Sequence, residues 1–363
     1  MTSRGDITWL ARPEIRSLNA YVPASYRDDL TRLNANEAPW TSASDTHERP
    51  LNLYPTARPD HLTTLLAAHY DVSPTQLFVT RGTSEAIDLL IRCFCRPGVD
   101  RIVICPPTFG MYKVYADIQG AAVHNVPLRL DDDDLLPVDD ILASWTGTTR
   151  LVFVTTPNNP TGQSVTPRAI GRLAEALDGK GLVIVDAAYI EFADSQAVMA
   201  LLQVPNVVIL RTMSKAYGLA GARCGSLIGS SAVIDLVARV MPPYAVPTPS
   251  VESATAALIS ESFSVMPTRV AQLNKQREAM REALTELPCV RRVWPSDANF
   301  LLVEFEDASA ALAVTEAAGY LLRDFSNADG LTGCLRITIG SDSDNQRVLE
   351  ALRSLSSMGE TSS

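Results

Sequence analysis

The sequence predicts an α/β protein whose parallel sheet is covered by helices on both faces, followed by a smaller α+β domain. Short apolar runs rich in β-forming residues recur through the first two thirds of the chain, at 77–80, 101–105, 151–156, 181–186, 206–212 and 224–229. Stretches with helical periodicity lie between most of these runs, for example at 86–94. Strands that are apolar on both faces and alternate with helices are typical of a parallel sheet with helices on both sides.

The smaller domain is predicted from a change of pattern near residue 250. Four prolines mark the junction: Pro242, Pro243, Pro247 and Pro249. Beyond them the pattern predicts a long helical stretch at about 251–287, a strand at 299–305, a helix near 308–318, a strand at 334–339 and a last helix near 345–355. We therefore expect a second unit in which helices and strands are mixed.

Composition and charge argue against several classes of protein. The 363 residues carry 31 lysines and arginines against 41 aspartates and glutamates, a net charge of −10, whereas domains that bind nucleic acid are normally basic. The six cysteines and four histidines are scattered, and no spacing among them suits a metal site. The start is polar and no long apolar segment follows, so we expect a cytoplasmic protein with free thiols that binds neither nucleic acid nor a membrane.

Polar residues gather at the carboxyl ends of four of the predicted strands. They lie in the segments 81–84, 157–162, 186–189 and 211–215. Ligands of open α/β sheets bind just outside the carboxyl ends of the strands. We therefore expect the four segments to line one pocket.

Two of these segments could serve either binding or structure. Gly82, Thr83 and Ser84 open a predicted helix, where backbone N–H groups and the helix dipole favour an anion. The same residues would also make an ordinary helix N-cap. Asn159 lies in a turn between prolines; its amide suits a phenolic oxygen, but it could equally be a plain turn residue.

Asp186, Lys215 and Arg223 carry the strongest chemical signal. Asp186 closes an apolar strand, where a carboxylate is costly unless it is paired; it could cap a helix or hold a proton on a ring nitrogen. Lys215 follows another apolar strand, and desolvation there would lower its pKa and leave a neutral amine able to attack a carbonyl carbon. Arg223, among glycines, offers a fork of donors to a phosphate. Together these groups describe a pyridoxal phosphate site.

The same segments resemble the aspartate-aminotransferase-like superfamily of fold type I, in residues 157–162, 186–189 and 212–225. Within it the chain is similar to the histidinol-phosphate aminotransferase family, through the segments 33–37, 53–55, 107–112, 321–324 and 334–340. The resemblance runs in order from about residue 15 to 355. It implies a large cofactor-binding domain at 45–250 with a mainly parallel seven-stranded sheet, and a small domain formed by 1–44 and 251–363.

The resemblance also implies roles around pyridoxal 5′-phosphate. Lys215 bonds covalently to the cofactor and shuttles a proton, and Asp186 pairs with the protonated ring nitrogen. Tyr189 and Asn159 form hydrogen bonds to the 3′ oxygen of the cofactor, and Phe109 stacks on the cofactor ring. The phosphate contacts are implied for Gly82, Thr83, Ser84, Ser214 and Arg223, and for Tyr54 from the partner subunit of a homodimer.

Substrate contacts are implied for three further residues. Arg336 would bind the carboxylate of glutamate, while Arg323 and Tyr21 would help it to hold the phosphate of the second substrate. Without the resemblance, both arginines would be interpreted as surface charge.

The resemblance implies a transaminase that moves an amino group from L-glutamate to imidazole-acetol phosphate, giving L-histidinol phosphate and 2-oxoglutarate in a ping-pong cycle. Two rival activities keep the cofactor and the fold: an aminotransferase for aromatic amino acids and a decarboxylase of phosphorylated threonine. Arg323 beside Arg336 favours a substrate with a phosphate. A non-catalytic sensor with an appended DNA-binding segment is disfavoured by the acidic charge.

Overall fold

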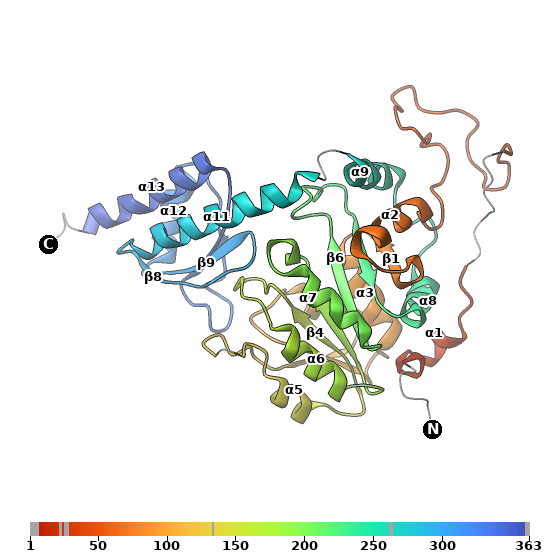
Figure 1. Cartoon of the computed structure of the whole chain (residues 1–363), viewed down its shortest axis with the longest axis horizontal. Helices are drawn as coiled ribbons and strands as arrows, with labels where there is room; N and C mark the ends of the chain where they lie inside the picture. Colours follow the sequence, from red (N-terminus) through yellow and green to blue (C-terminus); the bar gives the residue numbers. More distant parts are fainter. Residues whose placement is uncertain (1–6, 22–23, 25–28, 133, 261–263, 360–363) are drawn as a thin grey trace.

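A seven-stranded sheet forms the centre of the larger part of the molecule (Figure 1). The computed structural model describes residues 7–21, 24, 29–132, 134–260 and 264–359. The strands follow in the spatial order β1 (Leu77–Thr80), β7 (Gly225–Ile228), β6 (Val207–Thr212), β5 (Leu182–Asp186), β4 (Thr149–Thr155), β2 (Arg101–Ile104) and β3 (Ala122–Asn125). This confirms the predicted α/β fold.

Strand direction brings the carboxyl ends of four strands to one edge of the sheet. The pairs β2–β3, β2–β4, β4–β5 and β5–β6 are parallel, whereas β7 runs antiparallel to both β6 and β1. Since β1 and β6 are both antiparallel to β7, they run parallel to each other. The ends of β1, β4, β5 and β6 therefore point the same way, as the sequence predicted.

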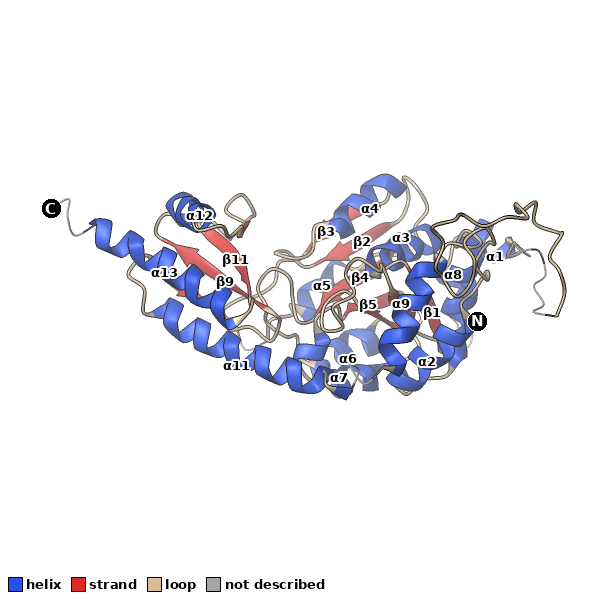
Figure 2. Cartoon of the chain, turned by 90° about the horizontal axis from the view of Figure 1, so that it is seen from above, coloured by secondary structure: helices blue, strands red, loops and turns tan. Residues whose placement is uncertain are grey.

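Helices cover both faces of this sheet because its central strands are apolar on both sides. Along β5, Leu182 and Ile184 pack on one face, while Val183 and Val185 pack on the other. The first face is covered by α3 (Thr83–Phe94), α4 (Met111–Gln119) and α8 (Ser231–Val240), and the second by α5 (Val138–Ser144), α6 (Pro167–Ala176), α7 (Ser195–Met199) and η4 (Ala200–Gln203). Figure 2 shows the sheet between the two layers.

A smaller α+β unit lies at the C-terminal side of the molecule (Figure 2). Its four-stranded antiparallel sheet has the order β10 (Arg323–Asp324), β11 (Cys334–Thr338), β9 (Phe300–Phe305) and β8 (Val290–Val293). Three helices pack their apolar side chains on it: α11 (Met266–Thr285), α12 (Ala308–Ala317) and α13 (Asp342–Gly359). The predicted second domain is thus present.

The small unit contacts the large one beside the polar turn that follows β4. Gly162 has a φ of +82°, and a Cβ at this position would overlap the side chain of Ser296. The carbonyl oxygen of Gly162 accepts a hydrogen bond from the Asp297 N–H at 2.8 Å. A side chain at Gly162 would therefore be both strained and too large for this contact.

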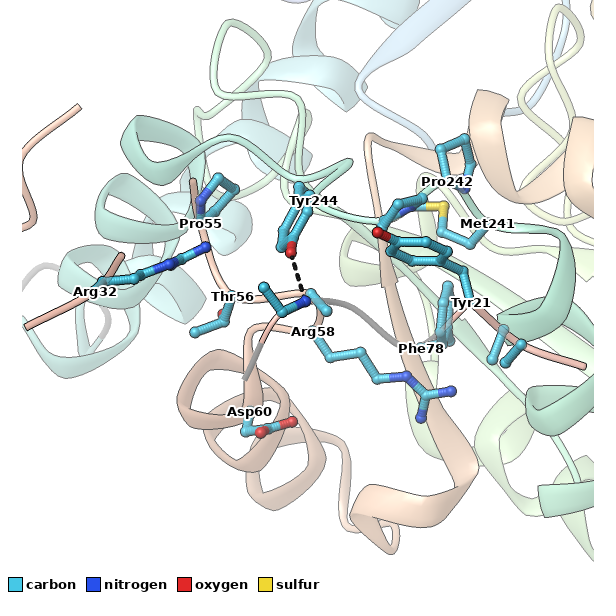
Figure 3. A pocket seen from close by; sticks show the side chains of 15 residues that line it. Tyr21, Arg32, Pro55, Thr56, Arg58, Asp60, Phe78, Met241, Pro242 and Tyr244 are labelled. Atoms are coloured by element: carbon cyan, nitrogen blue, oxygen red, sulfur yellow. Dashed lines mark hydrogen bonds between the residues drawn. The ribbon is translucent and has the colours of Figure 1, made fainter. Parts of the chain in front are cut away.

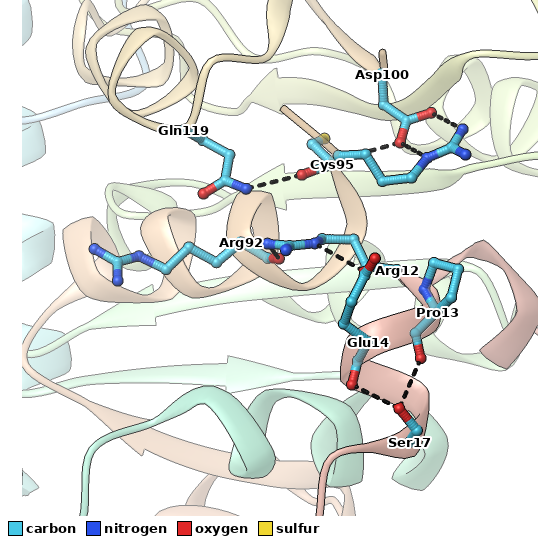
Figure 4. Close-up of polar contacts among 9 residues, drawn as sticks. Arg12, Pro13, Glu14, Ser17, Arg92, Cys95, Asp100 and Gln119 are labelled. Carbon is cyan, nitrogen blue, oxygen red and sulfur yellow. Dashed lines mark hydrogen bonds and ion pairs between the residues drawn. The ribbon is translucent and has the colours of Figure 1, made fainter. Parts of the chain in front are cut away.

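The N-terminal residues pack differently from the predicted grouping of 1–44 with the small domain. Ile7, Leu10 and Ile15, in η1 (Thr8–Leu10) and α1 (Pro13–Ser17), join the apolar core on the α3 and α8 face of the large sheet. The Arg12 backbone N–H donates to the Cys93 carbonyl at 2.9 Å. Its Nη1 donates to the Arg92 carbonyl at 3.1 Å (Figure 4). Apolar residues at the extreme N-terminus are buried where a matching surface exists, and here α3 and α8 supply it.

The C-terminal boundary also differs from the predicted one at 250/251. Helix α9 (Thr248–Ile259) packs through Ala254 against α2 (Asp60–Tyr70), and both belong to the apolar cluster around β1, near η2 (Pro74–Gln76). This packing favours a boundary between α9 and α11. The described residues between α1 and α2 contain no helix or strand, and Figure 1 shows them as an arm on the outer side of the large unit.

Three further observations concern expected properties of the chain. All six cysteines are free thiols. Among the described helices, none has the length and apolar character needed to cross a bilayer. Within the same described ranges, no three His, Cys, Asp or Glu side chains are grouped as a metal site would require.

Candidate active site

One cavity of about 180 Å³ lies at the carboxyl ends of β1, β4, β5 and β6. Ten of the predicted cofactor residues line it: Gly82, Thr83, Ser84, Phe109, Asn159, Asp186, Tyr189, Ser214, Lys215 and Arg223. Thr155, Ala188, Thr212 and Ala220, which the sequence did not single out, complete the lining. The structure therefore brings the four polar segments into one site, as the strand pattern predicted.

Asp186 is the last residue of β5 and lies at the floor of this cavity. Its side chain is buried (3% exposed), and the desolvation raises its carboxyl pKa to about 6, although hydrogen bonds from Tyr112 and from the Ala188 N–H oppose the rise. The Tyr112 hydroxyl donates to Oδ2 at 2.8 Å and the Ala188 N–H to Oδ1 at 3.2 Å. Above pH 6, this carboxylate is therefore a negative charge held in a buried, desolvated environment.

Tyr112 is a functional residue that sequence reasoning missed. It lies in the second position of α4 and is fully buried. Its hydroxyl also lies 2.7 Å from Thr155 Oγ1, which lies 3.1 Å from Thr108 Oγ1. The only signal in the sequence was the aromatic residue three positions after Phe109, which by itself is indistinguishable from an ordinary core residue.

Lys215 extends into the cavity from the loop after β6, three residues beyond Thr212. Its Nζ lies 5.2 Å from the centre of the Tyr189 ring. Desolvation lowers the pKa of this amine, nearby Arg336 and Arg223 lower it further, and Asp186 acts in the opposite direction. The amine is therefore more readily neutral, and so more nucleophilic, than that of a solvated lysine.

A group of donors at the other end of the cavity suits a phosphate. Gly82 precedes α3, whose first residues Thr83 and Ser84 present free N–H groups and hydroxyls. Arg223 Nη1 lies 3.5 Å from the Ser214 hydroxyl, and that hydroxyl accepts a hydrogen bond from Thr212 at 2.9 Å. The arrangement combines a helix N-terminus, hydroxyls and a guanidinium, the usual donors for a phosphate dianion.

Asn159 and Tyr189 face the small domain across the cavity. Asn159 Oδ1 accepts a hydrogen bond from Arg336 Nη1, and burial raises the pKa of Tyr189 to about 12. The turn that carries Asn159 is held by its neighbour, because Asn158 Nδ2 donates to the Pro107 carbonyl and to Thr161 Oγ1, both at 2.9 Å. The predicted turn residue is thus also a contact between the two domains.

The two predicted substrate arginines are neighbours across strands β10 and β11. Arg323 is paired with Arg336 in the antiparallel register. Arg336 lies over the rings of Phe300 and Phe325, at 5.0 and 5.4 Å, and its Nε is buried without a hydrogen-bond partner. Desolvation lowers the pKa of Arg336, Tyr189 opposes the change, and the charge of Arg323 lowers the pKa further. An anionic ligand would satisfy the orphaned donor and offset the repulsion between the two cations.

Tyr21 and Tyr54 lie away from this cavity within the subunit. Tyr54 is 50% exposed and stacks on Tyr244, with ring centres 4.9 Å apart. Tyr21 is 66% exposed and borders a separate cavity of about 430 Å³ with Arg58 and Tyr244 (Figure 3). The structure therefore does not place these two tyrosines with the other predicted site residues of the same chain.

Comparison with known proteins decides the family. Residues 28–352 match the family described as aminotransferase class I and II. The chain belongs to this family. Over 347 residues, the aminotransferase is 42% identical to histidinol-phosphate aminotransferase of Aeromonas salmonicida (strain A449), covering 95% of this chain and 97% of that protein. It is 41% identical over 352 residues to the Shigella flexneri enzyme of the same name, covering 96% and 98%.

Solved structures share the fold of this aminotransferase. Histidinol-phosphate aminotransferase from Clostridium acetobutylicum superposes with a TM-score of 0.76 at 21% identity, covering 85% of this chain and 92% of that one. The enzyme of that name from Sinorhizobium meliloti, in complex with pyridoxal-5′-phosphate, gives 0.73 at 23% identity, covering 84% of each chain. L-threonine-O-3-phosphate decarboxylase from Porphyromonas gingivalis also gives 0.73, at 24% identity, covering 85% and 91%. The fold alone therefore does not separate the two chemistries.

The site of this aminotransferase has the donors that pyridoxal phosphate requires. Asp186 offers a buried negative charge for a protonated ring nitrogen, and Lys215 offers an amine with a lowered pKa for the aldehyde. Gly82 leaves a cradle at the phosphate end, since a Cβ there would lie 2.8 Å from Arg223 Nη2. The residues present therefore fit this cofactor.

Proposed function

We propose that this aminotransferase uses pyridoxal 5′-phosphate to move an amino group from L-glutamate to imidazole-acetol phosphate, which gives L-histidinol phosphate and 2-oxoglutarate. The observation that carries the proposal is the single cavity in which Lys215 and Asp186 lie together, bordered by Asn159, which is hydrogen-bonded to Arg336. Similarity at about 41% identity over nearly the whole length of histidinol-phosphate aminotransferases supports this choice of substrates.

The cofactor, when bound, supplies an electron sink for the charge that develops at the substrate carbon. Asp186 keeps a proton on the ring nitrogen, and the hydrogen bond from Tyr112 fixes that carboxylate. Lys215 would bond to the aldehyde carbon of the cofactor and, when free of it, would be the base that carries a proton between the substrate carbon and that same cofactor carbon. Arg336 binds the substrate carboxylate and orients it, and Arg323 adds the charge that a phosphate requires.

We also propose a homodimer in which Tyr54 and Tyr21 reach the active site of the partner subunit. The arm between α1 and α2 supports this proposal, because several of its large apolar side chains are exposed: Tyr21, Leu30, Leu33, Trp40, Leu51 and Tyr54. Apolar side chains gathered on one exposed segment are typical of an interface. A cytoplasmic location is likewise a proposal, supported by six cysteines that are all free.

Gly82→Ala is expected to weaken cofactor binding about tenfold, since strain of this kind costs about 1–3 kcal/mol. Gly82 has a φ of +81°, and the added Cβ would push against Arg223. Cofactor affinity is measured by fluorescence titration of the apoprotein. Gly147→Ala, where a Cβ meets no atom within 4 Å, is the matched control. Equal affinities in the two variants would refute the role of Gly82 in the phosphate cradle.

The rate at which the apoprotein binds cofactor covalently is expected to rise with pH and to level off below pH 10.5, the ordinary pKa of lysine. The sign follows from the lowered pKa of Lys215, because the reactive neutral amine then predominates at a lower pH. Arg336→Ala removes a cation that lowers this pKa, so the curve should move to higher pH. Stopped-flow absorbance without any amino donor measures both curves, and an unchanged curve in the variant would contradict the assignment.

The choice of substrate is tested with Arg323→Ala. Loss of a charged contact to phosphate is expected to lower kcat/KM for imidazole-acetol phosphate about 30-fold. The value for phenylpyruvate, which has no phosphate, should change by less than about threefold. Arg353→Ala, at another exposed arginine, should change neither. A wild-type protein that prefers phenylpyruvate would instead be an aminotransferase for aromatic amino acids. A wild-type protein that releases CO₂ from phosphothreonine without transferring an amino group would instead be a decarboxylase.

A further inference from the structure

A buried ion pair lies directly behind the active site, on the strand that leads to Lys215. Arg211, in β6, contacts Glu191, in η3 (Ile190–Phe192), with Nη2 at 2.8 Å and Nε at 3.3 Å from Oε1. The side chains are only 5% and 4% exposed. Neither residue lines the catalytic cavity.

Two neighbouring residues of α2 lie beside this pair: one contacts Arg211, and the other contacts Tyr217. The Arg211 guanidinium lies 4.6 Å from the ring centre of Tyr70. The neighbouring His69 has its Nε2 2.7 Å from the hydroxyl of Tyr217. We call Arg211, Glu191, Tyr70, His69 and Tyr217 the Arg211 cluster. It connects three segments of the chain that are distant in sequence.

The Arg211 cluster is attached to both halves of the catalytic machinery. Arg211 and Tyr217 lie on either side of Lys215, four residues before it and two after it. Glu191 follows Tyr189 by two residues and Asp186 by five. The cluster therefore joins the loop that carries Lys215 to the segment that carries Asp186 and Tyr189.

Stability alone does not account for such a pair. Two charges lose their hydration on burial, and replacing a buried ion pair by apolar side chains of similar size is often neutral or even stabilising. Two N–H groups of Arg211 point to one oxygen of Glu191. Such a directional, charge-assisted contact also fixes the distance between the elements that it joins. Small displacements of a reacting group are costly, since about 1 Å can cost about 10²-fold in rate.

We propose that Arg211 and Glu191 are positioning residues that hold the Lys215 loop against the Asp186–Tyr189 segment. The inference rests on the proposed function, in which Lys215 bonds to the cofactor and Asp186 holds its ring. Arg211 and Glu191 act on the reaction only through these residues. The ion pair thereby sets the distance between the amine and the carboxylate.

The test is the double variant Arg211→Met/Glu191→Leu. It removes one positive and one negative charge, so the net charge near Lys215 stays the same and no buried charge is left unpaired. A change in the pH at which the lysine–cofactor linkage titrates then indicates a changed position of Lys215 relative to Asp186. We expect the pH at which its visible absorbance changes to shift by at least about 0.5 unit. We also expect kcat to fall about tenfold with KM within about threefold.

A second ion pair provides the matched control. Arg150 Nε lies 3.1 Å from Asp100 Oδ1, with side chains 12% and 1% exposed, at the amino-terminal edge of the large sheet. Asp100 also pairs with Arg96, whose side chain is 39% exposed and can be hydrated when the carboxylate is removed. Arg150→Met/Asp100→Asn should leave the absorbance titration and kcat unchanged. Thermal melting of the apoproteins shows that the variants are folded. If the Arg211 double variant does not fold, Glu191→Gln, which keeps the size of the side chain, should show the same fall in kcat with little change of KM.

The outcomes separate this inference from the proposed function. The positioning role would be overturned by a folded Arg211 double variant that keeps the wild-type absorbance titration and the wild-type kcat. If the double variant does not fold, a wild-type kcat in Glu191→Gln would overturn it. If the wild-type protein binds the cofactor covalently but does not act on histidinol phosphate, the proposed substrate fails. A shifted titration in the variant would still support the inference in that case.

Discussion

Lys215→Ala is expected to lower kcat by about 10⁴-fold or more, because the variant loses both the nucleophile and the base that moves the substrate proton. The protein should remain folded, since Lys215 lies in the lining of an open cavity and forms no ion pair with the residues that the structure describes. It should still bind pyridoxal phosphate through Arg223, Ser214 and the start of α3, but without a covalent bond. Steady-state assays and the absorbance spectrum of the bound cofactor measure the two effects.

Lys180→Ala provides the control for this experiment. Lys180 is exposed, and its amine donates to the Ala176 carbonyl at 3.0 Å. This variant should keep the wild-type rate and spectrum. Normal transamination in Lys215→Ala would refute the assignment of the catalytic amine.

Asp186→Asn is expected to lower kcat about 10³-fold, the scale on which a fixed electrostatic contact to the reacting group contributes. An amide keeps the shape of the side chain, but it has no charge with which to hold a proton on the ring nitrogen. The amide oxygen can still accept from the Ala188 N–H, and the amide NH2 group can donate to the Tyr112 hydroxyl, so the fold should be unchanged. Rates and melting temperatures of the variant measure this directly.

Tyr112→Phe gives a graded comparison with Asp186→Asn. It removes one hydrogen bond, of 2.8 Å, to the carboxylate but leaves its charge. We expect a fall of about tenfold in kcat, in line with the loss of one contact to a charged group. An Asp186→Asn variant that is as active as Tyr112→Phe would show that the charge is not what the reaction uses.

Much of the large domain could be predicted because its strands are apolar on both faces. The six predicted runs correspond to β1, β2, β4, β5, β6 and β7, with ends that differ by at most two residues. The seventh strand, β3, was missed, because Ala122–Asn125 lies at the edge of the sheet, where only one strand pairs with it and polar residues are tolerated. The antiparallel orientation of β7 could not be predicted either, because the apolar pattern of a short strand is the same in a parallel and in an antiparallel arrangement.

The small domain shows the same limit. Strands β9 and β11 are mostly buried and were predicted, whereas β8 contains the exposed residues Arg291 and Arg292 and was not. Ile7, Leu10 and Ile15 pack on the large sheet, although residues 1–44 were predicted to group with the small domain. An apolar pattern shows that residues are buried but not which surface buries them.

The site could be predicted where strand ends gathered polar residues. Eight of the ten predicted cofactor residues that line the cavity lie in the four polar segments that follow apolar strands, and these segments meet at one edge of the sheet. Phe109 was expected from the family resemblance, and Arg223 from its place among glycines. Tyr112 lies outside these segments, and Arg211 lies within one of them but received no role from the pattern. One lies in a helix and the other within a strand, and their importance appears only when their partners Asp186 and Glu191 are seen beside them.

The most direct test is to treat the cofactor-loaded protein with borohydride, which makes a lysine–cofactor bond permanent, and to map the labelled peptide by mass spectrometry. We predict that the added mass of the cofactor is found on Lys215 alone. L-histidinol phosphate added before the borohydride should prevent the labelling, because it releases Lys215 from the cofactor. Label on Lys113, Lys180 or Lys275, or labelling that L-histidinol phosphate does not change, would contradict it.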